Sequence, residues 1–175
     1  MIEEKPSLLV SYSFWVGWPL IFALIACLLT IFYGPYAAGS GVPEVIGALN
    51  GVQGGGAFYV STLITKIIGT SFAVMGNLAV GKEGPLAHIG AICGSIVPYI
   101  PISRFATYRN DSDKRTFIAA GCSAGVAAAF GAPIGGTLFT YEISKPNTFW
   151  TFSMLWRVFF SAAIAVFSLG FFQQL

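Results

Sequence analysis

The chain has 175 residues, of which 55% are hydrophobic and 9% are charged. Soluble domains carry about 25% charged residues, so the composition excludes an ordinary soluble domain and predicts an integral, multi-pass membrane protein. The formal net charge is only +2, and no basic cluster accompanies it, which argues against a nucleic-acid partner. The sequence does not indicate which membrane holds the chain.

The first third of the chain predicts one membrane span and a broken segment. Residues 1–13 are expected to be a polar or interfacial segment, and they lack the basic region that opens a cleavable signal peptide. The uncharged run Phe14–Phe32 is long enough to cross a hydrocarbon core of about 30 Å. A Gly- and Pro-containing break at 37–44 leads into a short amphipathic piece that ends near Leu49.

The rest of the chain alternates apolar segments with breaks. The predicted elements are an apolar segment Ala57–Met75 carrying Lys66, a helix Leu86–Pro101, an aqueous loop at 104–115, two short helices within Thr116–Tyr141 separated at 131–133, and a final span Phe149–Phe172. The fold class is therefore all-α, with polytopic membrane helices and broken or re-entrant segments. We expect residues 1–175 to form a single transmembrane unit.

The stretch from Gly76 to Pro85 places a charge pair, Lys82 and Glu83, in an otherwise apolar region. The flanking glycines and the proline predict non-helical backbone leading into a helix, with Pro85 near its first position. At membrane depth, irregular backbone is tolerated only where it is buried in protein or lines a cavity. An ionisable residue there predicts a functional site.

Three interpretations of this charge pair compete. Residues 76–82 match the first seven places of a phosphate-binding loop, but Glu83 stands where Ser or Thr should hold magnesium, so a nucleotide site is disfavoured. Glu83 can instead be a structural helix cap, favoured by the helix dipole. Free N–H groups at a helix start also bind anions, so Glu83 and a free anion would compete for one positive pocket, which makes Glu83 a candidate gate.

A second helix start repeats this pattern at Gly39, Ser40, Gly41, Val42 and Pro43. Ser40 offers a hydroxyl and the glycines expose backbone N–H groups, although an ordinary N-cap would use the same residues. Two such breaks in one small membrane chain favour a shared anion site.

Other candidate groups have simpler interpretations. His88 lies about one turn past Glu83 and can shuttle protons or simply pack. Glu44 and Glu142 stand at segment ends and are expected to be interfacial. The three cysteines lack metal-ligand spacing and are expected to be inert thiols, so no metal site is predicted. The sequon at 110–112 lies in the predicted aqueous loop.

Small residues recur four apart along the predicted helices. The pairs are Gly47 and Gly51, Gly90 and Gly94, Gly121 and Gly125, and Gly131 and Gly135. Such pairs let helix backbones approach closely in lipid, and they predict tight packing without indicating a function.

Three signatures together resemble the CLC family of voltage-gated chloride channels and chloride/proton antiporters. They are Gly39–Glu44, Gly81–Pro85, and Ala129–Gly136 followed by Leu138, Phe139 and Glu142. Their order and spacing also agree with the family, from about residue 14 onward. A further signature of the family, G-x-F-x-P, and the later tyrosine of its chloride site do not occur in these 175 residues. The chain is thus expected to be an N-terminal-half fragment, covering most of one of the family's two inverted repeats.

The resemblance implies a homodimer in lipid with one anion pore per subunit. It implies that Ser40 contacts chloride and favours it over nitrate, that Glu83 is the external gate, and that backbone amides at 39–43 and 81–85 contribute anion sites. Lys82 is a common variant within the family. The family's antiporters typically carry a second glutamate for internal proton transfer, and that position here is Ile143.

These observations predict a transport protein that is not an enzyme. The expected function is chloride movement across a membrane through a glutamate-gated pathway, with chloride as substrate and no cofactor. Ile143 favours a passive channel. The alternatives are a proton-coupled antiporter, or a non-transporting fragment that only associates with membrane or with a full-length subunit.

Overall fold

The computed structural model describes residues 8–52, 55–101, 108–145 and 150–174. Its α-helices are α1 (Leu8–Tyr33), α2 (Val42–Leu49), α3 (Val60–Met75), α4 (Glu83–Ile96), α5 (Asp111–Phe130), α6 (Pro133–Ser144) and α7 (Phe152–Gln173). The described connections between them include the short 3-10 turns η1 (Pro35–Ala37), η2 (Gly55–Phe58) and η3 (Val97–Tyr99). None of the described residues forms a strand, and the predicted all-α fold with broken segments is confirmed.

The predicted break between two short helices lies at Gly131 and Pro133. Gly131 ends α5 in the left-handed conformation, with φ of 65°, which glycine adopts at no steric cost. Pro133 then opens α6, where its missing N–H would have no helical partner. The chain therefore reverses within three residues, and α6 packs back on α5.

Several predicted boundaries differ from the structure by a few residues, and helix α4, for example, spans Glu83–Ile96 instead of Leu86–Pro101. Helix α5 begins at Asp111, so residues 111–115 of the predicted aqueous loop are helical, and residues 104–107 lie outside the described residues. Asp111 and Asp113 stabilise this first turn by facing the positive end of the helix dipole. Helix α1 begins at Leu8, so residues 8–13 of the predicted N-terminal segment are also helical, while residues 1–7 lie outside the described part.

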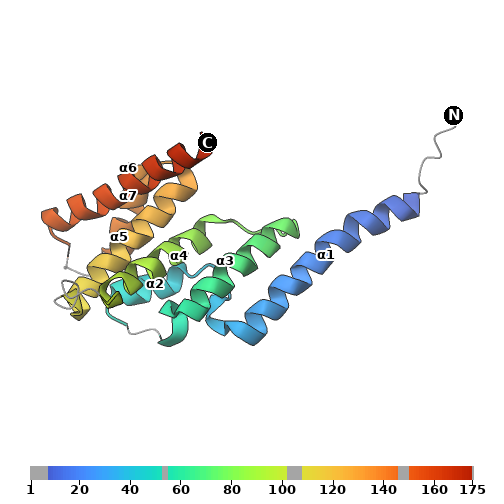
Figure 1. The fold of residues 1–175 in the computed structure, drawn as a ribbon, viewed down its shortest axis with the longest axis horizontal. Coiled ribbons are helices and arrows are strands. Elements are labelled where there is room, and N and C mark those ends of the chain that lie inside the picture. The colour runs from blue at the N-terminus through green and yellow to red at the C-terminus, as the bar shows by residue number, and fades with distance from the viewer. Residues whose placement is uncertain (1–7, 53–54, 102–107, 146–149, 175) are drawn as a thin grey trace.

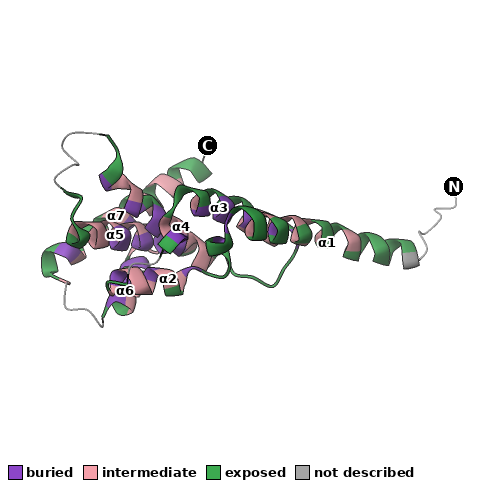
Figure 2. Ribbon diagram, turned by 90° about the horizontal axis from the view of Figure 1, so that it is seen from below, coloured by how far each residue is buried: buried purple, intermediate pink, exposed green. Residues whose placement is uncertain are grey.

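The core lies where α4 crosses α5, with α2 and α7 packed against the pair (Figures 1 and 2). Gly90 of α4 lies so close to α5 that an added Cβ would be 3.1 Å from the Cα of Gly125 and would overlap the carbonyl oxygen of Gly121. Gly94 and Gly121 are equally crowded by the facing backbone. Two of the predicted small-residue pairs therefore form the tightest helix contact of the core.

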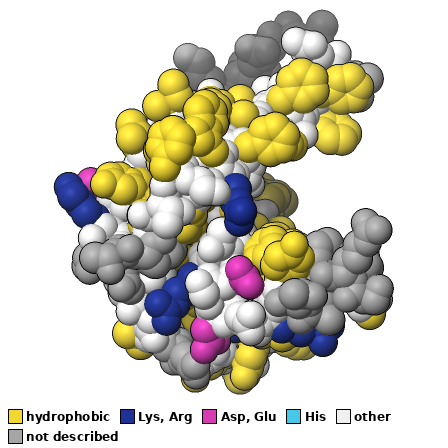
Figure 3. Space-filling model, turned by 90° about the vertical axis from the view of Figure 1, so that its left-hand side faces the viewer, with side chains coloured by type: hydrophobic (Ala, Val, Ile, Leu, Met, Phe, Trp, Pro, Cys, Tyr) yellow, Lys and Arg dark blue, Asp and Glu magenta, His cyan; other side chains and the backbone are white. Residues whose placement is uncertain are grey.

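Helix α1 extends away from this core and packs mainly on α3 (Figure 1). Most of its residues are exposed, including Phe14, Trp15 and Phe32 (Figure 2). Within the described residues, Val10–Tyr33 and Phe152–Gln173 are long and apolar enough to cross a membrane. Apolar side chains also cover the upper part of the face in Figure 3, and charged side chains gather below them. This exposed apolar surface suits contact with lipid.

Candidate functional site

The two helix starts predicted from the sequence lie side by side in the fold. A cavity of about 670 Å³ is bounded by α1, α3 and the segments that lead into α2 and α4. Its lining includes Gly39 and Ser40 from the first break, and Gly81, Glu83, Gly84 and Pro85 from the second. Broken helices whose N-termini face one cavity are a recurrent way to bind an ion within a membrane protein.

Ser40 lies in the turn before α2, and its hydroxyl is at the N-terminal end of the helix. Its Oγ accepts a hydrogen bond from the N–H of Val42 at 3.3 Å. Because Oγ is the acceptor in that bond, the hydroxyl hydrogen remains available to donate. The N–H groups of the first helical turn also have no acceptor within the helix. Ser40 and this turn can therefore present several donors to one anion.

Glu83 is the first residue of α4, and Lys82 is the N-cap. Its carboxylate folds back over Gly81, because a Cβ added there would overlap Glu83 Oε2. Its side chain is half-buried and lines the cavity. A carboxylate at this place lies against the positive end of the helix dipole, where a free anion would also be stabilised.

Lys66 is a member of the site that sequence reasoning left without a role. Its side chain is 2% exposed, and its ammonium group donates to the carbonyl oxygens of Ala37 at 3.1 Å and Gly39 at 2.8 Å. It therefore holds the turn before Ser40 from the α3 side and places a positive charge at the cavity. The sequence signal was a single lysine within an apolar segment, which marks a functional position by default.

The same turn is held from its other side by His88 of α4. The His88 ring is fully buried and lies against Gly41, where an added Cβ would be 2.6 Å from the His88 Cβ. Its Nε2 lies 3.0 Å from the carbonyl oxygen of Ala57. Because a carbonyl oxygen only accepts, Nε2 is the donor.

The remaining predicted residues lie outside the cavity lining. Gly41 is buried behind the Ser40 turn, whereas Lys82 is exposed. Val42 and Pro43 form the first turn of α2 without lining the cavity. Ile143 lies near the end of α6, half-buried against the hydrophobic core, on a different element from Glu83.

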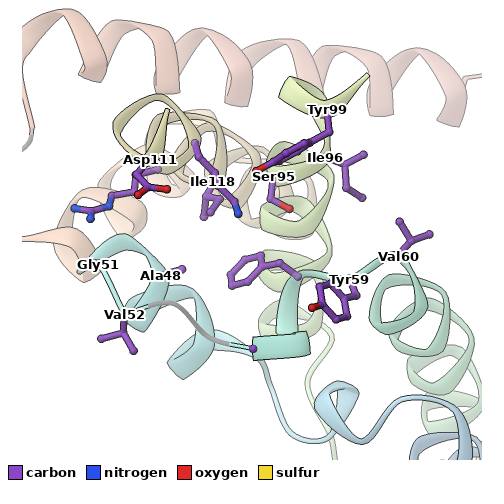
Figure 4. Close-up of a pocket in the computed structure, with 14 residues that line it drawn as sticks. Ala48, Gly51, Val52, Tyr59, Val60, Ser95, Ile96, Tyr99, Asp111 and Ile118 are labelled. Atoms are coloured by element: carbon purple, nitrogen blue, oxygen red, sulfur yellow. The ribbon is translucent and has the colours of Figure 1, made fainter. Parts of the chain in front are cut away.

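A second cavity, also about 670 Å³, lies at the opposite end of α2 (Figure 4). It is lined by the ends of α2 and α4, the start of α5 and the η2 turn, and it includes Tyr59, Tyr99, Asp111, Lys114 and Arg115. None of the predicted anion-site residues lines it. The Ser40–Glu83 site and the cluster of charged residues at the start of α5 therefore line two different cavities.

The chemistry available at the first cavity is that of anion binding. It offers backbone N–H groups, the hydroxyls of Ser40 and of three threonines, and one lysine, with a carboxylate as a competing anion. Across the described parts of the chain, no three His, Cys, Asp or Glu side chains gather to hold a metal ion. Broken helices that face one cavity are typical of a class of protein, the helical membrane transporters, which bind a substrate ion at such helix ends.

Comparison with known proteins places the chain within that class. A family model described as the voltage gated chloride channel family matches residues 22–175. The chain belongs to this family, the CLC family, which confirms the resemblance read from its three signatures. Proteins of the family are integral membrane transporters of chloride.

Several relatives match nearly the whole chain. It is 42% identical to chloride channel protein C of Dictyostelium discoideum over 94% of its length, and 39% identical to the human H(+)/Cl(-) exchange transporter 7 over 96%. The chain spans 22% of the length of each of these relatives. The solved structure of a eukaryotic CLC transporter matches 93% of this chain with a TM-score of 0.81 at 25% identity, and the match covers 30% of that structure.

Proposed function

We propose that this chain forms part of a chloride pathway in which Ser40 and the helix starts of α2 and α4 bind the anion and Glu83 gates it. The observation that carries the proposal is the shared cavity, which Ser40 and Glu83 line together although forty-three positions separate them along the chain. Backbone N–H groups within residues 39–43 and 81–85 would supply the donors, except at Pro43 and Pro85, which have no N–H, and Lys66 would add positive charge from α3.

The gate works by competition for these donors. With its carboxylate ionised and over the start of α4, Glu83 occupies the place that an anion would take. Protonation removes the negative charge, and a swing of the side chain empties the place, so either event opens the pathway. Chloride flux is therefore expected to depend on pH through Glu83.

The test is Glu83→Ala in the complete chain that carries these residues, reconstituted in liposomes. Chloride efflux in the variant is expected to lose the pH dependence of the wild type, because alanine cannot compete for the helix start. Glu142→Ala is the matched control, since Glu142 is exposed and pairs with Lys145 at 3.6 Å on α6. A Glu83→Ala protein with wild-type pH and voltage dependence would show that Glu83 is not the gate.

We favour passive conduction because the internal proton-transfer position is Ile143, which cannot carry a proton. Ile143 packs against the hydrophobic core, so no aqueous partner for Glu83 is expected there. Proton movement measured together with chloride flux decides this point. Chloride flux without stoichiometric proton counter-movement is the expected result.

Exchange of protons for chloride is the second candidate, and the observation that favours it is the similarity to a named exchanger. The human H(+)/Cl(-) exchange transporter 7 is 39% identical over 96% of this chain. If the same measurement shows protons moving against chloride at a fixed ratio, this candidate replaces the channel. The complete protein is proposed to assemble as a homodimer in lipid, which cross-linking in native membranes would test.

A further inference from the structure

We propose that His88 is a positioning residue that locks the Ser40 turn to α4 and thereby sets the selectivity of the anion site. This inference rests on the proposed anion-binding role of Ser40. It assigns to His88 a role distinct from the gate, because His88 lies five positions after Glu83 in the same helix and does not line the cavity.

The His88 ring connects three segments that are distant in sequence. It belongs to α4, its Nε2 donates to Ala57 in the η2 turn at 3.0 Å, and its ring lies edge-on to Phe58 with centroids 5.7 Å apart. Its opposite edge faces Gly41, at the start of α2. With 0% exposure the ring has no room to rotate away, so the spacing between these three segments follows from its shape.

Gly41 fits the ring in two ways. Its φ of 81° is left-handed, which disfavours residues with a Cβ. A Cβ there would also overlap the imidazole Nδ1 and Cγ of His88. Because Gly41 directly follows Ser40, any displacement of the ring changes where the Ser40 hydroxyl points.

The hydrogen bonding favours positioning over proton shuttling. A shuttle needs a proton-exchanging group on each ring nitrogen. The Nε2 partner is the backbone carbonyl of Ala57, which does not exchange protons, and among the described residues Nδ1 has no hydrogen-bond partner. The ring is therefore suited to holding α4, the η2 turn and the start of α2 at fixed distances from one another.

The experiment compares His88→Ala with His88→Gln in the complete chain. Glutamine keeps an N–H donor for Ala57 and fills much of the space of the ring, whereas alanine removes both the donor and most of that volume. Hydrogen–deuterium exchange of the peptide covering residues 37–45 reports the order of the turn, and the ratio of chloride to nitrate flux reports the anion site. In His88→Ala we expect the exchange rate of this peptide to rise, and the chloride-to-nitrate flux ratio to fall, each on the order of tenfold. A change of this size corresponds to the loss of one buried hydrogen bond.

His88→Gln is expected to keep both values near those of the wild type. Unchanged exchange in a folded His88→Ala protein would overturn the proposal, and so would equal losses in both variants. Faster exchange with an unchanged flux ratio would overturn the link to selectivity. The exchange measurement does not require transport, so a wild-type protein that moves no chloride would refute the proposed function while leaving the positioning role to be decided by exchange alone.

A second pair of variants tests the fit between ring and glycine. Gly41→Ala alone is expected to disorder the turn, because its Cβ overlaps the ring. In Gly41→Ala/His88→Ala the overlap is removed. The increase in hydrogen–deuterium exchange of the turn in this double variant should therefore be smaller than the sum of the increases in the two single variants. Strictly additive effects would show that the ring and Gly41 do not constrain each other.

Discussion

Ser40 packs directly over Gly84, so that a Cβ added to Gly84 would lie 2.8 Å from the Cβ of Ser40. The starts of α2 and α4 thus meet with only the Ser40 side chain between them, because Gly84 has none. This contact brings the proposed anion contact next to the proposed gate, because Gly84 immediately follows Glu83. The predictions below concern this contact, the residues around it and the packing of α4 on α5.

Gly84→Ala should displace Ser40, because the added methyl group and the Ser40 side chain cannot occupy the same space. Relieving this overlap is expected to cost about 1–2 kcal/mol, which corresponds to a chloride affinity lower on the order of tenfold. Isothermal titration of the complete chain with chloride measures the affinity. Gly17→Ala is the control, because nothing lies within 4 Å of its added Cβ. Unchanged chloride affinity in Gly84→Ala would contradict the close contact.

Lys66→Met should weaken chloride binding on the order of tenfold, since it removes a charged donor to two backbone carbonyls near Ser40. The change also leaves the Ala37 and Gly39 carbonyls without that partner. Chloride titration measures the effect, and Lys145→Met on the exposed end of α6 is the matched control. Equal affinities for the two variants would remove Lys66 from the site.

Ser40→Ala should lower the ratio of chloride to nitrate flux severalfold, because it removes a hydroxyl donor and the Oγ that accepts from Val42. Flux assays with each anion in turn measure the ratio. Ser71→Ala is a suitable comparison, since the Ser71 hydroxyl bonds only the Ile67 carbonyl one turn earlier in α3. A retained preference for chloride in Ser40→Ala would place the anion elsewhere.

Gly90→Ala should destabilise the fold by about 1–3 kcal/mol, because its methyl group would overlap the Gly121 carbonyl on α5. Thermal unfolding in detergent, followed by tryptophan fluorescence, is expected to shift to lower temperature. Gly170→Ala in α7 has nothing within 4 Å of the added Cβ and should not lower the transition. Similar shifts for the two variants would mean that the α4–α5 contact is looser than described.

The sequence by itself predicted the all-α fold class and singled out Ser40 and Glu83, two of the residues that line the candidate site. Its composition requires lipid-facing helices, and Gly131 with Pro133 can only interrupt a helix. The start of α5 was missed by a few residues, because the acidic residues Asp111 and Asp113 read equally as loop or as the first turn of a helix.

Tertiary structure alone decided which of those residues meet. The sequence marked Ser40 and Glu83 as parts of two similar breaks, but their common cavity depends on how α3 and α4 fold back after α2. The partners of Lys66 and His88 lie at least twenty-seven positions away along the chain. Local patterns carry no information on such pairings, because long-range packing, rather than sequence neighbours, brings those groups within hydrogen-bonding distance.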